Sequence, residues 1–283
     1  MNKIPTVKLN NSVTMPQIGL GTWLTKDGPE VEQAVITALK YGYRLIDTAK
    51  YYGNEESIGR AIKASGIKRE EIFITTKLWN ADQGYEPALK AFEESLERLG
   101  LDYIDLYLIH WPMPKVGKYI ETWKAFEKLY ADKKVRAIGV SNFTIETLQD
   151  LINNAGVMPV INQIELHPKF AQHEMRDFCK QHNIQVESYS PLMHGGDILS
   201  DNVIQRIADK YHKTIAQVVL RWHIQNGLVV IPKSVDPDRI RENINIFDFH
   251  LDDNEMQIID AMDAGVRNNP DPDKFNRLSL LLT

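Results

Sequence analysis

The stretch Asp47-Thr-Ala-Lys-Tyr-Tyr-Gly-Asn-Glu55 is the part of the chain from which its fold can first be inferred. It follows the short apolar run Arg44–Ile46, which is typical of a buried strand, and it precedes a helical run from Glu56. A polar loop between a strand and a helix indicates a βα unit. This loop carries a carboxylate, Asp47, and a phenol, Tyr52, five positions apart.

The same alternation continues along most of the chain. Strands are expected at Gln17–Gly21, Arg44–Ile46, Phe73–Thr76, Ile104–Ile109, Arg136–Val140, Val160–Gln163, Gln185–Ser188 and Val229–Pro232. Amphipathic helices are expected at Glu30–Tyr41, Glu56–Ser65, Glu86–Leu99, Ile120–Asp132, Ile145–Asn154, His173–Gln181, Pro237–Asn245 and Asp253–Met262, with one or two more within Asp201–Gln225.

Eight strands, each followed by a helix, predict an α/β fold of the (β/α)8 TIM-barrel type over residues 1–283, as one domain. An N-terminal β-hairpin, Val7–Leu9 with Val13–Met15, and extra C-terminal helices are expected to decorate it. A doubly wound sheet would also alternate strands and helices. However, Gly19-Leu-Gly21 lacks the third glycine of a dinucleotide fingerprint and opens no helix, which favours the barrel.

Composition restricts the possible partners. The chain has 33 lysines and arginines against 38 aspartates and glutamates, a net charge of −5, which argues against a nucleic-acid surface. The single cysteine, Cys179, excludes a disulfide framework and a cysteine-based zinc site. No apolar run approaches membrane-spanning length, and the N-terminus lacks a secretory pattern. We therefore expect a soluble, cytoplasmic protein with no nucleic-acid or membrane partner and no bound metal.

Four candidate catalytic residues, Asp47, Tyr52, Lys77 and His110, follow three successive predicted strands. In a parallel barrel the carboxyl ends of all strands open onto one face, so these side chains should converge. Taken singly, each is more often a cap, a solvated charge or a packing residue. Together they can transfer a proton to a carbonyl, with Tyr52 as the acid and Lys77 lowering the pKa of its phenol. Asp47 would hold Lys77, and His110 would orient the substrate.

Aromatic residues gather just past the predicted strand ends, at Trp23, Tyr52, Trp79 and Trp111. They indicate an apolar substrate pocket, although core packing is the usual role of aromatic residues. Trp123 and Trp222 lie within helical runs and are expected to pack. A second polar group, Lys233, Ser234 and Arg239, follows the eighth strand, where barrel enzymes often bind phosphate.

Together these residues resemble the aldo-keto reductase superfamily from about Val7 to Phe275. The motifs that carry the resemblance are Gly42-Tyr-Arg-Leu-Ile-Asp47-Thr-Ala-x-x-Tyr52-Gly-Asn-Glu, Thr75-Thr-Lys77-Leu-Trp79, Asp105-Leu-Tyr-Leu-Ile-His110-Trp-Pro, Ile138-Gly-Val-Ser-Asn-Phe, Asn162-Gln-Ile-Glu-Leu-His-Pro and Ile231-Pro-Lys-Ser. Within the superfamily it is similar to the prokaryotic and protozoan branch, which includes 2,5-diketo-gluconate, glyoxal and methylglyoxal reductases and a prostaglandin F synthase.

The resemblance implies NADPH-dependent reduction of aldehydes and ketones to alcohols by a monomer, with Tyr52 as the proton donor. Small carbonyl compounds such as methylglyoxal, aromatic aldehydes or diketo-sugars are the implied substrates. It also implies that His110, Trp23, Trp79 and Trp111 contact the substrate. The implied cofactor residues are Ser141, Asn142, Gln163, Tyr189, Ser190, Leu192, Lys233, Ser234, Val235, Arg239, Glu242 and Asn243.

Three alternatives stay open at this point. The chain could be a barrel that binds NADPH as a sensor or structural subunit without turnover, or a reductase with prostaglandin F synthase-type specificity. It could also be a barrel lyase, isomerase or hydrolase, although Glu165-x-His167 is a sparse metal pair. Asp236 stands where some relatives are basic, so use of NADH is less strongly excluded.

Overall fold

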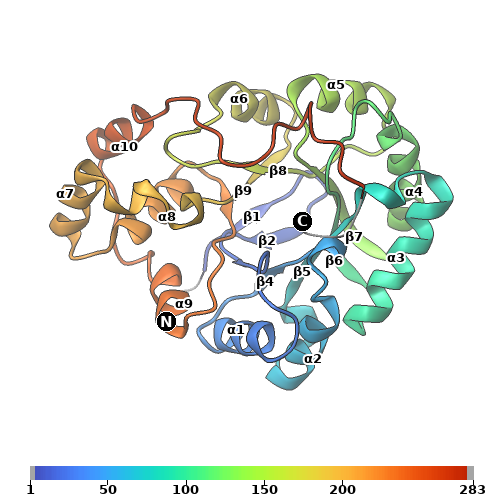
Figure 1. Ribbon diagram of the computed structural model, residues 1–283, viewed down its shortest axis with the longest axis horizontal. Helices are drawn as coiled ribbons and strands as arrows, with labels where there is room; N and C mark the ends of the chain where they lie inside the picture. Colours follow the sequence, from blue (N-terminus) through green and yellow to red (C-terminus); the bar gives the residue numbers. More distant parts are fainter. Residues whose placement is uncertain (1–3, 279–283) are drawn as a thin grey trace.

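The computed structural model describes residues 4–278 and confirms the predicted (β/α)8 barrel (Figure 1). Within the described residues, its parallel sheet has eight strands, in the order β10-β9-β8-β7-β6-β5-β4-β3. They are β3 (Leu20–Gly21), β4 (Leu45–Asp47), β5 (Phe73–Leu78), β6 (Ile104–Ile109), β7 (Val135–Ser141), β8 (Ile161–Glu165), β9 (Gln185–Tyr189) and β10 (Val229–Val230).

The first and last strands of the sheet close the barrel. Gly19 N donates to Val230 O at 2.9 Å, and Val230 N donates to Gln17 O at 3.0 Å. A further parallel bridge joins Gly21 to Lys233. Closure of the barrel pairs the two edge strands of the sheet. It also places Lys233 beside Gly21, the last residue of β3.

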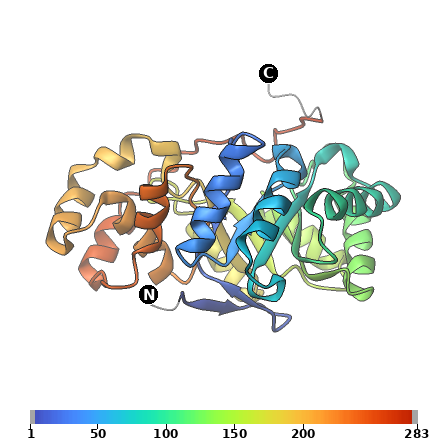
Figure 2. The same ribbon diagram turned by 90° about the horizontal axis from the view of Figure 1, so that it is seen from below.

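A two-stranded antiparallel hairpin precedes the barrel, as predicted, and consists of β1 (Thr6–Lys8) and β2 (Thr14–Pro16). Figure 2 shows it at one end of the barrel, whereas the last described segment of the chain crosses the other end. Leu9 and Met15 of the hairpin region are buried against Leu45, Phe73 and other barrel residues. The hairpin therefore plugs the amino-terminal end of the barrel and leaves the carboxyl-terminal end for the site.

Helices surround the barrel and agree with the predicted segments to within two residues at most ends. They are α1 (Pro29–Lys40), α2 (Glu55–Ser65), α3 (Tyr85–Leu99), α4 (Tyr119–Ala131), α5 (Ile145–Asn154), α6 (His173–Gln181), α7 (Asn202–Tyr211), α8 (Ile215–Gln225), α9 (Pro237–Ile244) and α10 (Asp253–Asp260). None of the helices between residues 4 and 278 has the length and apolar character needed to cross a bilayer.

The segment for which one or two helices were predicted forms two, because its sequence contains a stop and a new start. His212 ends α7 in the left-handed region, at φ 53°. Thr214 then begins α8 with a capping box, in which its hydroxyl accepts from Gln217 N and the Gln217 side chain accepts from Thr214 N. Such reciprocal bonds satisfy amides that have no partner within the helix.

Within residues 4–278, two large apolar clusters form the core of the barrel, and a third, small one lies at its carboxyl-terminal end. The larger lies between the strands and the helices and includes Trp123 and Trp222, which are fully buried as predicted. The smaller fills the barrel interior and includes Leu45, Phe73 and Ile161. Because side chains alternate along a strand, the residues two or four positions after these also face inward, nearer the carboxyl-terminal end. The barrel interior is therefore apolar towards the amino-terminal end and polar towards the carboxyl-terminal end.

Gly59 shows how closely the helices pack. A Cβ atom added at Gly59 in α2 would lie 2.2 Å from the carbonyl oxygen of Leu99, the last residue of α3. We expect Gly59→Ala to lower the free energy of unfolding by roughly 1–3 kcal/mol, although alanine is by itself the better helix former. Urea unfolding of this variant beside Lys63→Ala, at an exposed position of the same helix, would measure the effect. Unchanged stability of Gly59→Ala would contradict this packing.

Candidate active site

The carboxyl-terminal end of the barrel brings the four predicted catalytic residues together. Asp47 is the last residue of β4, Lys77 lies in β5, and His110 directly follows β6. Lys77 Nζ donates to Asp47 Oδ1 at 2.6 Å and to Tyr52 Oη at 3.3 Å. The rings of Tyr52 and His110 lie edge to face, with centroids 5.8 Å apart. Residues far apart in sequence thus form one cluster.

The position of Lys77 differs from the prediction in one respect. The predicted strand Phe73–Thr76 ended before Lys77, but β5 continues to Leu78 and all six of its residues are buried. Lys77 therefore points into the barrel from within a strand, four positions after the inward-facing Phe73. Its side chain is 0% exposed, because Asp47 and the Thr48 carbonyl satisfy its ammonium inside the barrel.

Tyr52 reaches the cluster through a tight turn. It ends the short 3-10 helix η1 (Lys50–Tyr52), and Gly53 follows in the left-handed region at φ 66°. Asn54 is fully buried and donates to the carbonyl oxygens of Thr22 and Thr25, while it accepts from Thr48 Oγ1 at 2.8 Å. These bonds tie the loop after β4 to the loop after β3 and hold the Tyr52 backbone in place.

The pKa of Tyr52 is raised to about 12, although Lys77 was predicted to lower it. Burial is the largest cause of the increase, and Lys77 acts in the expected direction by lowering the pKa, but it does not outweigh burial. Tyr52 is therefore protonated at neutral pH. The phenol holds its proton and can donate it when negative charge develops nearby.

Lys77 and Asp47 form a buried ion pair. Burial acts to lower the pKa of Lys77, but the nearby Asp47 and Tyr52 outweigh it and the pKa is raised. Burial raises the pKa of Asp47, against the opposing effect of Lys77. The ammonium is therefore charged at neutral pH and is placed to stabilise a phenolate on Tyr52.

His110 is neutral in this environment. Burial, and then the charge of Lys77, hold the pKa of His110 well below its usual value. Its Nδ1 atom is buried without a hydrogen-bond partner among the described residues, and its backbone oxygen accepts from Asn142 Nδ2 at 3.0 Å. A neutral imidazole can donate one hydrogen bond to a carbonyl oxygen but does not act as a charged acid here.

Aromatic side chains form a wall beside this cluster. Tyr51 stacks on Trp79 with ring centroids 3.9 Å apart, and Trp111 packs against Phe275 at 4.2 Å. Trp79 and Trp111 therefore lie where the sequence predicted a substrate pocket. The ring of Trp23 meets that of His194, with centroids 5.4 Å apart, and Trp23 stays a predicted substrate residue. Tyr51 and Phe275 were not predicted to contribute.

The described part of the C-terminal segment, which ends at Leu278, crosses the carboxyl-terminal end of the barrel. After α10 the chain passes α6 and α5 (Figure 1). Trp79 Nε1 then donates to Leu278 O at 2.8 Å, and Asn80 Nδ2 donates to Arg277 O at 2.9 Å. The rest of the apolar tail, residues 279–283, lies outside the described residues.

Glu165 anchors the same segment. Its buried carboxylate accepts from the backbone amides of Asn268 and Asn269, at 2.6 and 3.0 Å, and pairs with His167 Nε2 at 3.2 Å. Burial alone would raise the pKa of Glu165, but these hydrogen bonds lower it. Among residues 4–278, no three His, Cys, Asp or Glu side chains gather so as to hold a metal ion. The Glu165–His167 pair therefore tethers the chain.

The predicted ring-binding residues lie next to the cluster. Tyr189 ends β9, and its hydroxyl donates to Asn142 Oδ1 at 2.7 Å. Asn142 follows β7 in the left-handed region at φ 63°. Ser141 Oγ donates to Gln163 O at 3.0 Å, and Gln163 Nε2 donates to Asp47 Oδ2 at 2.8 Å. These polar groups therefore share one hydrogen-bond network with the catalytic candidates.

The remaining predicted cofactor residues lie on the loops after β9 and β10 and on α9. Ser190 Oγ lies 3.1 Å from His194 Nε2, Leu192 packs on the core, and Val235 is exposed. Ser234 Oγ accepts from Asp236 N at 3.1 Å, and Asn243 is buried. Within residues 4–278 no carboxylate pairs with Lys233 or Arg239.

Asp236 caps α9, and its carboxylate accepts from the backbone amides of Asp238 and Arg239 at 2.9 and 3.0 Å. Those bonds to Arg239 and Asp238 lower the pKa of Asp236, which is therefore ionised at neutral pH. The amides at the start of α9 are consequently occupied by a negative side chain. The side chains of Lys233 and Arg239, which have no carboxylate partner within residues 4–278, can attract a phosphate there.

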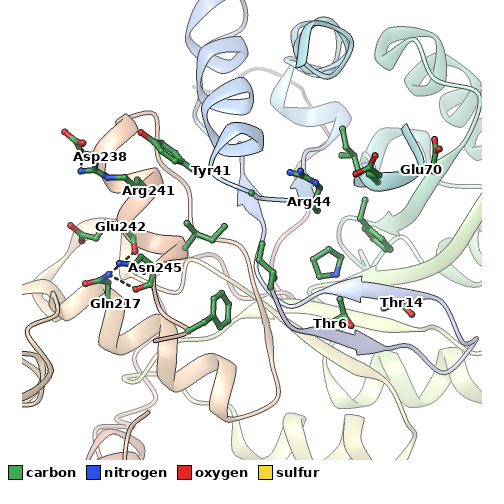
Figure 3. A pocket seen from close by; sticks show the side chains of 18 of the residues that line it. Thr6, Thr14, Tyr41, Arg44, Glu70, Gln217, Asp238, Arg241, Glu242 and Asn245 are labelled. Carbon is green, nitrogen blue, oxygen red and sulfur yellow. Dashed lines mark hydrogen bonds and ion pairs between the residues drawn. The ribbon is translucent and has the colours of Figure 1, made fainter. Parts of the chain in front are cut away.

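A large groove lies elsewhere on the molecule. It has a volume of about 1100 Å³ and lies between the hairpin, the start of β5 and α9, and includes Thr6, Arg44, Arg136 and Arg241 (Figure 3). Arg44 directly precedes β4 and Phe73 begins β5, so the part of the groove that they line is at the end opposite to the catalytic cluster. Glu242, predicted to contact the cofactor, lines this groove and accepts from Thr214 Oγ1 at 2.7 Å.

The closed parallel barrel and the buried acid–base cluster at its carboxyl-terminal end define a barrel enzyme. Residues 17–197 and 198–264 match the model of the aldo/keto reductase family. The chain is 54% identical over 270 residues to the glyoxal reductase of Bacillus subtilis strain 168, covering 95% of this chain and 97% of that protein.

A second relative has the same sequence identity. The 9,11-endoperoxide prostaglandin H2 reductase of Trypanosoma cruzi strain CL Brener is 54% identical over 271 residues, covering 95% of each chain. A solved structure of a Gox0644 variant in complex with NADPH has a TM-score of 0.90 and 48% identity, covering 97% of this chain and 99% of that one. The chain therefore belongs to the aldo/keto reductase family and is an oxidoreductase.

His110 should remain neutral when the pH falls from 8 to 6.5, because burial and Lys77 both disfavour the imidazolium form. Nitrogen-15 NMR of the histidine side chains, with His110→Asn used to assign the signal, would follow its protonation. An imidazolium pattern for His110 already present at pH 6.5 would contradict the geometry described above.

Proposed function

We propose that this protein reduces aldehydes and ketones to alcohols, using NADPH as the reductant and Tyr52 as the proton donor. The observation that carries the proposal is the contact of Tyr52 Oη with the buried Lys77 ammonium, beside the aromatic wall. NADPH, when bound, supplies a hydride to the carbonyl carbon. The NADPH complex of a 48%-identical structure supports this choice of cofactor.

The protein residues would manage the proton and the developing charge. Tyr52 is protonated at neutral pH, so it can give its proton to the carbonyl oxygen. Lys77 then stabilises the resulting phenolate, and Asp47 keeps Lys77 in place at 2.6 Å. The neutral His110 donates a hydrogen bond to the same carbonyl oxygen and so orients the substrate.

The residues at the rim fit a nicotinamide dinucleotide by their chemistry. Tyr189 would offer an aromatic platform to the ring, and Ser141, Asn142 and Gln163 would hold its carboxamide. Lys233 and Arg239, which have no carboxylate partner in the described part of the chain, would bind the 2′-phosphate. The other residues of the proposed cofactor site are Ser190, Leu192, Ser234, Val235, Glu242 and Asn243.

Small carbonyl compounds such as methylglyoxal, aromatic aldehydes and diketo-sugars are the proposed substrates. The name of the Bacillus relative, glyoxal reductase, supports small dicarbonyls. The stacked wall of Tyr51, Trp79, Trp111 and Phe275 would accept flat or apolar groups. Prostaglandin F synthase-type specificity is the second candidate, favoured by the name of the trypanosomal relative. We further propose that the protein works as a cytoplasmic monomer.

Tyr52→Phe should strongly reduce NADPH oxidation with methylglyoxal, with kcat falling about a hundredfold to ten-thousandfold, because general acid catalysis is worth about 10² to 10⁴. NADPH binding, followed by quenching of tryptophan fluorescence, should be retained. Near-normal kcat in Tyr52→Phe would remove Tyr52 as the acid. NADPH binding by the wild type without turnover on a broad carbonyl panel would instead favour a sensor or structural barrel.

Lys233→Ala should raise the KM for NADPH by about tenfold or more, because a charge-assisted bond to the 2′-phosphate is lost. The KM for NADH, which lacks that phosphate, should change little and serves as the internal control. Steady-state kinetics with both cofactors would measure the two effects. Equal losses with NADPH and NADH would show that Lys233 does not bind the 2′-phosphate.

A further inference from the structure

Glu187 is a buried carboxyl group that the proposed mechanism does not use. It lies in the middle of β9, is 0% exposed and pairs in register with Gln163 of β8 and Val229 of β10. Val229 belongs to the apolar cluster of the barrel interior, so Glu187 also faces inward. A carboxyl group is rarely buried so completely unless it has a specific partner.

The hydrogen-bond partner of Glu187 is the side chain of Gln163, which also bonds to the catalytic candidate Asp47. Gln163 Nε2 donates to Glu187 Oε2 at 2.9 Å and to Asp47 Oδ2 at 2.8 Å. An amide nitrogen has two hydrogens, so these two bonds occupy both of them. The carbonyl oxygen of the Gln163 side chain is then directed away from both carboxyl groups.

We propose that Glu187 is a positioning residue of the reductase site, which with Asp47 takes both amide hydrogens of Gln163 and leaves its oxygen to accept from the nicotinamide carboxamide. This inference rests on the proposed function, because it assumes that Gln163 contacts the cofactor. Asp47 alone would occupy one hydrogen and leave the second without a buried acceptor. Glu187 supplies that acceptor and thereby determines the orientation of the amide.

The charges around Glu187 make the arrangement sensitive to pH. The titratable groups that act on it or feel its charge are Asp47, Lys77 and Tyr52, and only Lys77 is a cation. Burial, and then the charge of Asp47, raise the pKa of Glu187 to about 8. The group is therefore protonated at neutral pH and still has an acceptor oxygen for Gln163, while its Oε1 atom has no partner within residues 4–278.

Ionisation of Glu187 would weaken the acid at the site. Below pH 8 the carboxyl group is neutral, and the pair of Asp47 and Lys77 is balanced. Above pH 8 a second negative charge enters the cluster, and this charge is one of the causes that raise the pKa of Tyr52. A weaker acid transfers its proton less readily, so kcat/KM should fall as the pH rises through about 8.

Two substitutions separate positioning from mere packing. Glu187→Leu removes the acceptor, and the NADPH dissociation constant measured by fluorescence titration should rise about tenfold, since a buried donor is left unpaired. Glu187→Gln keeps an acceptor oxygen and cannot ionise, so it should bind NADPH like the wild type at pH 7 and lose the alkaline fall in kcat/KM. Glu55→Gln, a buried glutamate outside the barrel paired with Arg98, should lower stability without changing the dissociation constant.

A folded Glu187→Leu variant, checked by circular dichroism, that binds NADPH as tightly as the wild type would overturn the proposal. If Glu187→Leu does not fold, an unchanged alkaline limb in Glu187→Gln overturns it instead. Failure of the proposed function is distinguishable, because the wild type would then not oxidise NADPH with any carbonyl substrate. The fluorescence titration of Glu187→Leu does not depend on turnover.

Discussion

The burial of one ammonium group is the constraint on which the rest of this structure depends. Lys77 is fully enclosed in the barrel, and a lone charge in such a place would be strongly unfavourable. Asp47 makes the burial possible by pairing with Lys77 at 2.6 Å, and the Thr48 carbonyl takes a second hydrogen. The third contact, to Tyr52, is the one from which we infer catalysis. The Lys77 ammonium group thus takes part both in the ion pair that makes its burial possible and in the chemistry that we propose.

The scaffold serves this constraint from several sides. The apolar cluster of the barrel interior and the N-terminal hairpin keep water out of the amino-terminal half of the barrel. This exclusion strengthens the interactions between the charged groups at the carboxyl-terminal end. Asn54 fixes the loop that carries Tyr52, and Glu165 holds the C-terminal segment that brings Phe275 against Trp111. Neither Asn54 nor Glu165 need touch the substrate, but each limits where a reacting group can lie.

Much of the fold was predictable because it rests on local patterns. Alternation of apolar strands with amphipathic helices predicted eight βα units, and α5 and α6 have the predicted bounds. Lys77 was predicted to follow its strand but lies inside it, because a charged residue looks like a strand end unless its buried partner is known. The predicted effect of Lys77 on the pKa of Tyr52 has the right sign, but burial outweighs it, and the extent of burial cannot be read along the chain.

The sequence by itself determined the order of the strands and helices, the residue types available at the strand ends and the family to which they belong. The tertiary structure decided which of those residues meet. Trp23 packs edge to face with His194, and Glu187, which no motif singled out, shares the Gln163 amide with Asp47. The reason is that periodicity records the face on which a side chain lies, whereas contacts and burial depend on how the barrel closes around it.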